Sequence, residues 1–547
     1  MSPPDWRFWS ALFAATLCLN YSALAGPDCD APGNPDSAIV DCSQSINSGK
    51  WKGSHLAAFY TNRGAAYHEK GDLDRAIADL SEAIKLDPKQ AMAWSNRGAA
   101  YNEQGDNDRA IADLSEAIRL DPKLTLALNN RGNAYSDKRD YDRAIADFNA
   151  AIRLNPRFAE AFSNRGSAYS AKGDNDRALA DVSEAIRLDP SHPKAFIGRG
   201  MIYSAKDDND RAIADFSAAI RLDPTSAMAF DHRGSAYNDK GDHDRAIADY
   251  SEAIRLDPKR ARAFQHRGYA YDDKGDHDRA IADFNEAIRL DPKFAVAFHN
   301  RAAAYRAKGD NDRAIADYSE AIRLDPEDAS AFHYRGVAYL AKGDDDRAIA
   351  DYSDAIRLDP KDPDGFNSRG LAYRAKGDFE RAIADFNEAI RLDPKSPVAY
   401  FARGLSYSFA GSFEKALADF NQASANAPDD AYLALWADIA DQRNKLPSRL
   451  AQASSRIDMI AWPAPVVKLF MNQMTPDAVL AAADNPDPSK KRGQVCEANF
   501  YSGELSLTKG LKEEATRLFR LAASDCPHGF NEWNAANAEL KALGVVP

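Results

Sequence analysis

A block of 34 residues recurs eleven times without interruption between residues 57 and 430. One position shows the period clearly. It is occupied by Gly64, Gly98, Gly132, Gly166, Gly200, Gly234, Gly268, Ala302, Gly336, Gly370 and Gly404. The Pro that closes each block keeps the same spacing, from Pro88 to Pro428. A fixed period of this length is typical of solenoids, in which each unit packs on its neighbours. The chain is therefore predicted to form an elongated stack rather than a domain with one central core.

Each block contains two helical patterns separated by a turn. In the second block the residues that share a helical face are Trp94, Gly98 and Tyr101 in the first pattern, and Ala110, Leu114, Ala117 and Ile118 in the second. Their spacing is that of an amphipathic helix. A Lys-Gly-Asp sequence or a close variant lies between the patterns, and glycine readily takes the left-handed conformation that ends a helix. Asp-Pro stops the second helix, because proline disfavours helix in the residue before it. Each block is therefore predicted to be two antiparallel helices.

This pattern resembles the tetratricopeptide repeat (TPR) family. The family's sequence of an aromatic, Gly, Tyr, Ala, a second aromatic, Ala and Pro is matched in the second block at Trp94, Gly98, Tyr101, Ala110, Leu114, Ala117 and Pro122. The resemblance covers all eleven blocks. It implies an all-α fold, a right-handed superhelical solenoid of antiparallel helix pairs whose first helices line a concave groove. The chain departs from the family at position 7, counted from Ala57, where every block has Arg in place of the common Leu.

The invariant arginines, Arg63 to Arg403, have acidic counterparts in the same register. Asp is found at position 23 of every block, as in Asp79, and at position 31 of most blocks, as in Asp87. Arginine binds carboxylates through two parallel hydrogen bonds. We therefore predict ion pairs within and between blocks, in preference to a track for polyanions.

The flanking sequences extend the array. Residues 38–46 match the second-helix pattern of residues 76–84, which predicts a lone second helix that caps the first block. Residues 496–527 match the block pattern again and predict a twelfth unit. The predicted segments are 1–25 (signal peptide), 26–56 (cap with a half repeat), 57–430 (eleven TPR units), 431–495 (irregular helices) and 496–547 (twelfth TPR-like unit and cap). Within the irregular segment we expect a helix at 432–444, a helix start at Thr475 and a polar loop at 485–492.

The first 25 residues have the pattern of a secretory signal. Arg7 precedes a stretch of twelve uncharged, mostly apolar residues, and Ala23-Leu24-Ala25 then forms a cleavage pattern. Twelve residues are too few to span a bilayer, which takes about 20. We predict cleavage after Ala25 and export, to a bacterial periplasm, of a mature chain without a membrane span. An uncleaved anchor and a cytosolic location are the alternatives.

The cysteines of the mature chain fall into two local pairs, Cys29 with Cys42 and Cys496 with Cys526. An oxidising compartment favours disulfides, and the local pairing avoids joining opposite ends of a long array. Free thiols and metal ligands are the alternatives. Neither pair has the close spacing of a structural zinc site.

Charge and motifs argue against several classes of function. The net charge of −13 comes from evenly mixed acids and bases, so no basic stripe is available for nucleic acid. We find no nucleotide-binding, metalloprotease or serine-hydrolase motif. The chain is therefore predicted to be a non-catalytic scaffold that binds an extended peptide or a partner protein, without a cofactor. An enzyme with an unrecognised site in residues 431–547 and a purely architectural, self-assembling spacer are the alternatives.

Position 6 carries the candidate binding residues. They are Asn62, Asn96, Asn130, Asn164 and Asn300, with His232 and His266 at the same position. The row resembles the groove asparagines of the O-linked N-acetylglucosamine transferase superhelix, which hold a peptide backbone. An amide offers one acceptor and two donors to a main chain. The alternative is an amide that hydrogen-bonds a neighbouring helix. A histidine metal site is disfavoured, because packed helices lie about 8–10 Å apart whereas zinc bonds are about 2 Å long.

Overall fold

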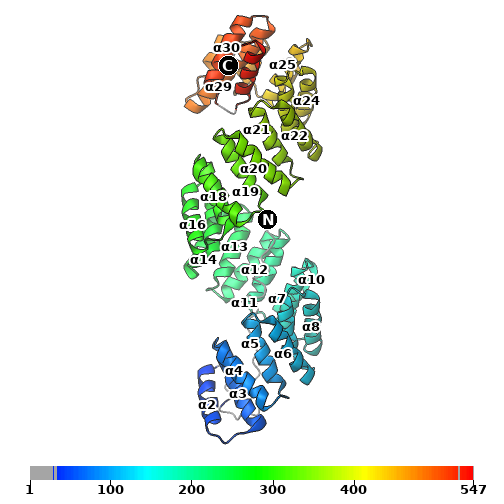
Figure 1. Cartoon of the computed structure of the whole chain (residues 1–547), viewed down its shortest axis with the longest axis vertical. Coiled ribbons are helices and arrows are strands. Elements are labelled where there is room, and N and C mark those ends of the chain that lie inside the picture. Colours follow the sequence, from blue (N-terminus) through cyan, green and yellow to red (C-terminus); the bar gives the residue numbers. More distant parts are fainter. Residues whose placement is uncertain (1–28, 30–33, 528–529, 546–547) are drawn as a thin grey trace. The chain divides into compact units, whose positions relative to one another are not determined.

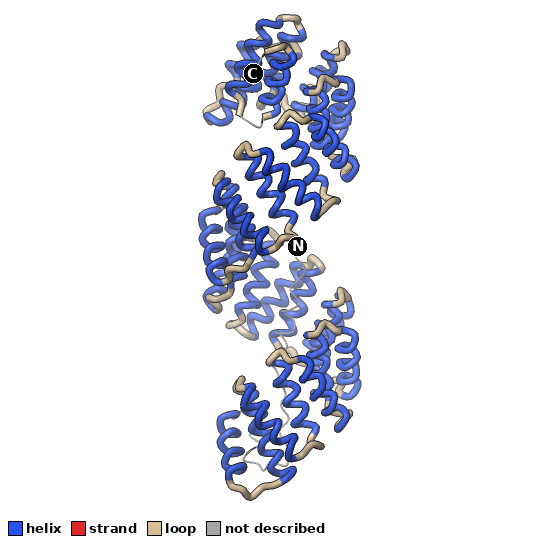
Figure 2. The backbone as a smooth tube through the Cα atoms, in the orientation of Figure 1, coloured by secondary structure: helices blue, strands red, loops and turns tan. Residues whose placement is uncertain are grey.

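The structure is a computed structural model that describes residues 29, 34–527 and 530–545 (Figure 1). Over these residues it contains 30 helices, α2 to α31, and no strand (Figure 2). The predicted all-α fold of consecutive helix pairs is therefore confirmed. The expected signal segment and its cleavage point at Ala25 lie outside the described residues. The chain divides into two compact units, Met1–Asp276 and His277–Pro547, and each is described by itself.

Unit 1 (Met1–Asp276) is a run of helical hairpins. It begins with α2 (Pro35–Asn47), which packs against α3 as expected for a capping second helix. The first helices are α3 (Gly53–Glu69), α5 (Ala91–Glu103), α7 (Thr125–Asp137), α9 (Ala159–Ala171), α11 (Pro193–Ala205), α13 (Ala227–Asp239) and α15 (Ala261–Asp273). The second helices are α4 (Leu73–Leu86), α6 (Asn107–Leu120), α8 (Tyr141–Leu154), α10 (Asn175–Leu188), α12 (Asn209–Leu222) and α14 (His243–Leu256).

Unit 2 (His277–Pro547) continues the repeat and then departs from it. It begins with the second helix α16 (His277–Leu290). Four hairpins follow: α17 (Ala295–Ala307) with α18 (Asn311–Leu324), α19 (Ala329–Ala341) with α20 (Asp345–Leu358), α21 (Pro363–Ala375) with α22 (Phe379–Leu392), and α23 (Pro397–Phe409) with α24 (Phe413–Asn426). The irregular part comprises α25 (Ala431–Arg443), α26 (Leu450–Ala453), α27 (Ala464–Phe470) and α28 (Pro476–Ala482).

The C-terminal module, α29 (Pro488–Thr508), α30 (Lys512–Asp525) and α31 (Asn531–Ala542), ends the chain. Helices α29 and α30 pack against each other as a hairpin. The polar loop predicted at residues 485–492 is wrong in its second half, because α29 already begins at Pro488. Asp487 caps this helix by accepting a hydrogen bond from the backbone N–H of Ser489 at 2.9 Å. An aspartate followed by proline is a favourable helix start, and it outweighs the polarity of the segment.

Turns between paired helices follow one pattern. In the second block, Gly105 has a φ of 81°, and Asp106 then accepts a hydrogen bond from the backbone N–H of Arg109 at 3.0 Å. The left-handed conformation favours glycine, because a Cβ would clash with the backbone there. Arg139 and Asp207 take the same conformation, with φ of 61° and 57°, where the sequence lacks the glycine. The local geometry of the repeat therefore overrides the residue preference at these two turns.

Close packing inside each hairpin explains the recurrent glycine at position 8. A Cβ added to Gly200 would lie 2.7 Å from Cε1 of Phe216, a buried ring of the paired helix. Ala302 stands at this position in the eighth block and is itself fully buried. That hairpin therefore accommodates a methyl group that the other hairpins have no room for.

Arginine–aspartate pairs link the helices of each hairpin. Arg97 donates from Nε and Nη2 to the two carboxylate oxygens of Asp113, at 2.7 and 2.9 Å, and from Nη1 to the hydroxyl of Ser81 in the preceding block at 3.1 Å. The predicted pairing within blocks is confirmed. The prediction for position 31 is wrong, because Asp87 accepts a turn hydrogen bond from the backbone N–H of Lys89 instead. The same pair recurs as Arg63–Asp79, Arg131–Asp147, Arg165–Asp181, Arg199–Asp215, Arg233–Asp249, Arg301–Asp317, Arg335–Asp351, Arg369–Asp385 and Arg403–Asp419.

Candidate functional site

First helices form the inner side of the stack in each unit. In unit 1, α3 contacts α5 and α5 contacts α7; in unit 2, α17 contacts α19 and α19 contacts α21. No contact of similar extent joins successive second helices within the described part of either unit. Because the first helices are closer together, each stack curves towards them. The side of each first helix that points away from its paired second helix therefore forms an inner face. This inner face is the candidate functional site.

Side chains at positions 5 and 6 meet across neighbouring first helices. Asn164, at position 6, donates from Nδ2 to Oδ1 of Asn129, at position 5 of the preceding block, at 3.0 Å. His266 and Asp231 are paired in the same way, with Nδ1 2.8 Å from Oδ1. In these blocks the side chain at position 6 therefore makes a contact between repeats. For the asparagines, this is the alternative role of a hydrogen bond to a neighbouring helix.

The remaining predicted asparagines have different surroundings. Asn62 is buried and donates from Nδ2 to the carbonyl oxygen of Cys29 at 3.4 Å, so it holds the N-terminal cap. Asn96 is also buried, and its Nδ2 has no hydrogen-bond partner within the described part of the chain. Asn130 and Asn300 are only half-buried. The predicted row therefore contains two partly exposed amides and three that are buried or engaged with a neighbour.

His232 of α13 and His266 of α15 belong to a buried polar cluster. Asp231 is 2% exposed and also accepts from Nε of Arg260 at 2.9 Å. Burial opposes the charge of Asp231, but His266 and Arg260 together lower its pKa. Burial lowers the pKa of His232 to about 4, so this imidazole is neutral at neutral pH, and it stacks on the ring of Phe216 at a centroid distance of 5.7 Å. Both histidines thus lie on the inner face and support contacts between blocks.

Unit 2 presents a different inner surface, which we call the arginine–tyrosine face: Arg306 of α17 with His333 and Tyr334 of α19. The Arg306 guanidinium carbon lies 5.3 Å from the Tyr334 ring centroid. The His333 ring lies edge-on to Tyr334 at 5.3 Å. Tyr334 is 38% exposed and Val296 is 46% exposed. This face combines one cation with an exposed aromatic ring, and neither residue was among the predicted binding residues.

Further along unit 2, the C-terminal module covers the inner face. Arg374 of α21 is 7% exposed and donates from Nη2 to Oδ1 of Asn531 in α31 at 2.8 Å. Leu405 of α23 is fully buried in the same core as Ala535 and Leu540 of α31. The inner face of unit 2 is therefore open at α17 and α19 and closed at α21 and α23.

Buried carboxylates hold the C-terminal module together. Arg443 of α25 donates from Nη2 to Glu504 of α29 and to Glu539 of α31, both at 2.8 Å. Glu497 accepts hydrogen bonds from Nε1 of Trp462 at 2.8 Å and from the hydroxyl of Tyr432 at 2.9 Å. These acids are enclosed and engaged by protein groups, so they tie the irregular segment to the module.

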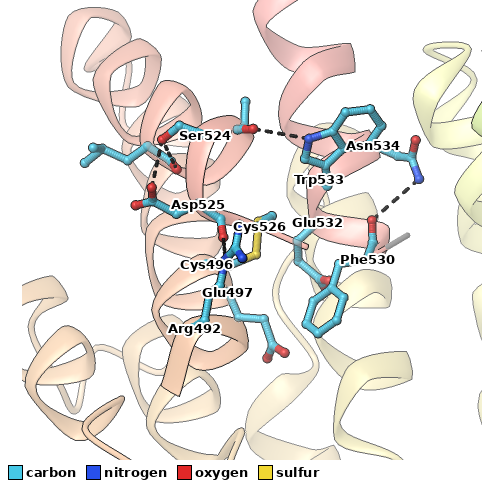
Figure 3. Close-up of a disulfide and its surroundings, with 12 residues drawn as sticks. Arg492, Cys496, Glu497, Ser524, Asp525, Cys526, Phe530, Glu532, Trp533 and Asn534 are labelled. Carbon is cyan, nitrogen blue, oxygen red and sulfur yellow. Dashed lines mark hydrogen bonds between the residues drawn. A yellow bond between two sulfur atoms is a disulfide. The ribbon is translucent and has the colours of Figure 1, made fainter. Parts of the chain in front are cut away.

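Burial raises the pKa of Glu504 to about 7, and a further acid of the module is shifted in the same direction. Glu532 of α31 is 5% exposed and accepts a hydrogen bond from the hydroxyl of Tyr501 at 3.0 Å. Burial and the neighbouring Glu497 raise the pKa of Glu532 to about 7, while Arg374 acts in the opposite direction. Figure 3 shows Glu532 and Glu497 beside the Cys496–Cys526 disulfide.

Disulfides close both ends of the described chain. Cys29 is bonded to Cys42 of α2, with a Cα–Cα distance of 5.2 Å, and Cys496 of α29 is bonded to Cys526 after α30, at 4.9 Å. Beside the second disulfide, Arg492 donates from Nε to the carbonyl oxygen of Asp525 at 2.9 Å (Figure 3). Each bond fastens a terminal segment to its neighbouring helix, where a stack has no further repeat to pack against.

A small cavity of about 210 Å³ lies between α24, α25 and the segment that follows them. Asp441 in its wall is paired with Arg449, with Oδ2 2.9 Å from Nε, and Asp438 accepts from Nε2 of Gln442 at 2.7 Å. Across the described residues, no three His, Cys, Asp or Glu side chains are placed to hold one metal ion. Nor does any described helix combine the length and apolarity needed to cross a bilayer.

Several solved structures are similar to parts of this chain. MamA is 29% identical over 30% of this chain and 96% of its own, with a TM-score of 0.28. YrrB, described as a TPR protein with an unusual peptide-binding site, is 26% identical over 34% of this chain and 97% of its own, with a TM-score of 0.30. A tetratricopeptide repeat protein from Parabacteroides merdae is 21% identical over 45% of this chain and 98% of its own, with a TM-score of 0.38.

Family models match most of the repeat array. The one described as TPR repeat matches residues 64–105, 98–138, 234–275, 302–343, 338–374 and 370–408. Models described as tetratricopeptide repeat match residues 125–158, 163–227, 261–294, 284–316 and 397–430. Taken together, the matches cover more than half of the chain, and they agree with the hairpins and turns described above. The chain belongs to the tetratricopeptide repeat family.

Proposed function

We propose that this protein is an exported, non-catalytic scaffold that binds an extended peptide or a partner protein along the inner face of its first helices. One observation carries the proposal. The residues that build the hairpins recur in nearly every block, whereas position 6 on the inner face changes between Asn, Gly, His, Tyr, Ser and Ala. Hairpins form with any of these residues, so the fold leaves the inner face free to differ along the array and to serve recognition.

The half-buried amides Asn130 and Asn300 are the main-chain contacts in this proposal. Each amide offers an acceptor and two donors, which suits the backbone of an extended peptide whatever its side chains are. His266 adds a half-exposed ring to the same face in unit 1. The buried Asn62, Asn96 and Asn164 support the positions of the first helices and contribute to binding indirectly.

Two features support the exported and non-catalytic parts of the proposal. The disulfides Cys29–Cys42 and Cys496–Cys526 fit an oxidising compartment, in agreement with the signal pattern before Gly26. The buried acids of the C-terminal module are engaged by protein groups such as Arg443 and Tyr501. N-terminal sequencing of the purified mature protein is expected to begin at Gly26, and a start at Met1 would contradict the export proposal.

Site-specific photocrosslinking in the native compartment tests the binding face. A photoreactive residue is placed at Asn130 or Val296 on the inner face, and at Arg119 or Arg323, which are exposed on second helices, as matched controls. The proposal predicts covalent adducts with a recurrent polypeptide from the inner positions and none from the controls. Adducts that form equally well from the second helices, or no adducts from the inner positions, would contradict it.

A further inference from the structure

Helix α25 keeps the register of a first helix but lacks the residues that pack a hairpin. Counted from Ala431, its positions 4, 7, 8 and 11 are Ala434, Ala437, Asp438 and Asp441. The eleven regular blocks have an aromatic residue or Leu, then Arg, then Gly or Ala, and then Tyr at these positions. In the second block, positions 7, 8 and 11 all contact the paired second helix. The corresponding side of α25 therefore carries small and acidic side chains instead.

A cavity lies where a second helix would pack on α25. The segment that follows forms only the four-residue helix α26, and the cavity of about 210 Å³ lies between α24, α25 and this segment. Arg449 replaces the missing arginine of position 7. It donates from Nε and Nη2 to Asp441 at 2.9 and 3.0 Å, and from Nη2 to Asn421 of the preceding block at 2.9 Å. Asp441 is thereby compensated, as its counterparts in the regular blocks are.

Asp438, in the wall of the same cavity, has no such compensation. Its side chain forms no ion pair with any described residue, although the residue is only 2% exposed. Oδ2 accepts a hydrogen bond from Nε2 of Gln442 at 2.7 Å, whereas Oδ1 is buried without a hydrogen-bond partner in the described chain. Burial raises the pKa of Asp438, while Ser448, Gln442 and Arg449 act in the opposite direction. A buried acceptor without a donor costs free energy, so a ligand that donates to Oδ1 would be stabilised.

The remaining lining restricts the chemistry of that ligand. The apolar part of the wall consists of Ala434, Ala437, Leu450 and Ala453. Arg456 lines the cavity and is exposed, so the cavity opens to solvent there and disfavours a second positive charge. A cavity of about 150 Å³ can hold benzene, so 210 Å³ suits a ligand of about six heavy atoms. An ammonium fits one free acceptor, whereas a guanidinium is shaped for two acceptors side by side.

We propose that the cavity between α25 and α26 binds a primary alkylammonium group. The ammonium donates to Oδ1 of Asp438, and the unbranched alkyl chain lies against Ala434 and Ala437. A lysine side chain of a partner and a free alkylamine share this chemistry. The cavity lies on the side of α25 that corresponds to the second-helix side of the other blocks. The assignment therefore goes beyond the proposed function and does not depend on binding at the inner face.

Saturation-transfer NMR on the full-length mature protein at neutral pH tests this assignment. The probe is n-pentylamine, and 1-pentanol is its neutral control. We expect the alcohol to bind about 10-fold more weakly, and Asp438→Asn to weaken binding of the amine by the same factor, as expected for about 1.4 kcal/mol. Asp477→Asn, which changes an exposed acid of α28 outside the cavity, is the matched control and leaves binding unchanged. The melting temperature of Asp438→Asn should not fall, because the amide oxygen still accepts from Gln442.

A second variant tests the cavity while keeping the carboxylate. Ala434→Leu narrows the cavity, and leucine is compatible with this register because Leu128 occupies position 4 of the third block. We expect this variant to keep its helicity and to lose saturation transfer to pentylamine. Binding that is unchanged in Ala434→Leu would overturn the assignment.

A blocked lysine distinguishes the two sources of the ammonium. Nα-acetyl-lysine methylamide that binds as tightly as pentylamine assigns the site to a lysine side chain of a partner, and weaker binding assigns it to a free alkylamine. Both results agree with the proposed chemistry. Equal binding of pentylamine and pentanol, unchanged binding in Asp438→Asn, or no binding of either amine would overturn it.

Discussion

Removing one arginine of the Arg–Asp series should loosen one hairpin of the array. Arg233 of α13 donates from Nε and Nη2 to the two carboxylate oxygens of Asp249 in α14, both at 2.8 Å, and from Nη1 to Ser217 of the preceding block at 3.1 Å. The Asp249 side chain is 9% exposed and that of Arg233 is 20% exposed. Arg233→Met therefore leaves a largely buried carboxylate without its cation.

The cost can be worked out from this burial. Breaking a fully buried pair by removing one partner destabilises a protein by about 3–5 kcal/mol, because the remaining charge is uncompensated. Since water reaches one edge of Arg233, we expect Arg233→Met to destabilise its hairpin by an amount at the lower end of this range, about 3 kcal/mol. Removing both charges in Arg233→Met/Asp249→Leu should recover most of this loss, because apolar side chains of similar size replace a buried ion pair at little cost.

Hydrogen-exchange mass spectrometry of the full chain measures the effect locally. In a repeat stack each hairpin is stabilised by itself and by its neighbours, so the opening equilibrium should rise about 100-fold in α13 and α14 and little in α5. The double variant should return protection in α13 and α14 close to wild type. Unchanged protection in Arg233→Met, or an equal loss in the double variant, would refute the reasoning that an uncompensated Asp249 carries the penalty.

Three further predictions address packing, turn geometry and pH. Gly336→Ala places a Cβ 2.8 Å from Cε1 of Tyr352 and should destabilise its hairpin by about 1–3 kcal/mol in denaturant unfolding; an unaffected midpoint would show that the hairpin relaxes freely. Asp207→Gly should stabilise its turn by about 1 kcal/mol, because the residue has a φ of 57°, while Asp207→Asn separates this effect from loss of charge. The third concerns Glu532, whose pKa is raised to about 7 from 4.5, so the folded state keeps a proton that the unfolded chain releases. Glu532 should therefore lower the stability of the C-terminal module by about 3 kcal/mol as pH rises from 4.5 to above 7, and Glu532→Gln should remove this part of the dependence in thermal melts. Glu504, whose pKa burial also raises to about 7, keeps its own part in that variant. An unchanged dependence in Glu532→Gln would contradict the assignment.

Most of the fold could be predicted from the sequence, because the interactions that form each hairpin are local and recur in every block. Gly105 and Asp106 set a turn by backbone conformation and capping, and neither depends on distant residues. The Arg97–Asp113 pair follows from register, since both residues recur in every block. Two predictions failed where local signals competed. The aspartate at position 31, such as Asp87, accepts a hydrogen bond within its turn instead of pairing with an arginine. The segment predicted as a polar loop begins a helix at Pro488, because Asp487 caps it.

The candidate site was predictable only in part. Position 6 lies on the first helices, and its amides have different surroundings: Asn164 donates a hydrogen bond to Asn129, whereas Asn130 is half-exposed. Arg306 and Tyr334 were missed because position 12 is Arg in only two blocks and position 6 is Tyr in only one. An arginine at position 12, which most other blocks fill with Ser, Asn, His, Asp or Leu, is the signal in the sequence that points to them.

The amino-acid sequence determined the hairpins, their turns and the ion pairs inside them, because each of these depends on residues within about one repeat of each other. Only the tertiary structure decided which part of the inner face in unit 2 is open. The contact that closes it joins Arg374 to Asn531, which are 157 residues apart. No periodic pattern encodes such a contact, since it depends on where the C-terminal module packs. The same position of the repeat is therefore a covered structural site in one block and an open surface in another.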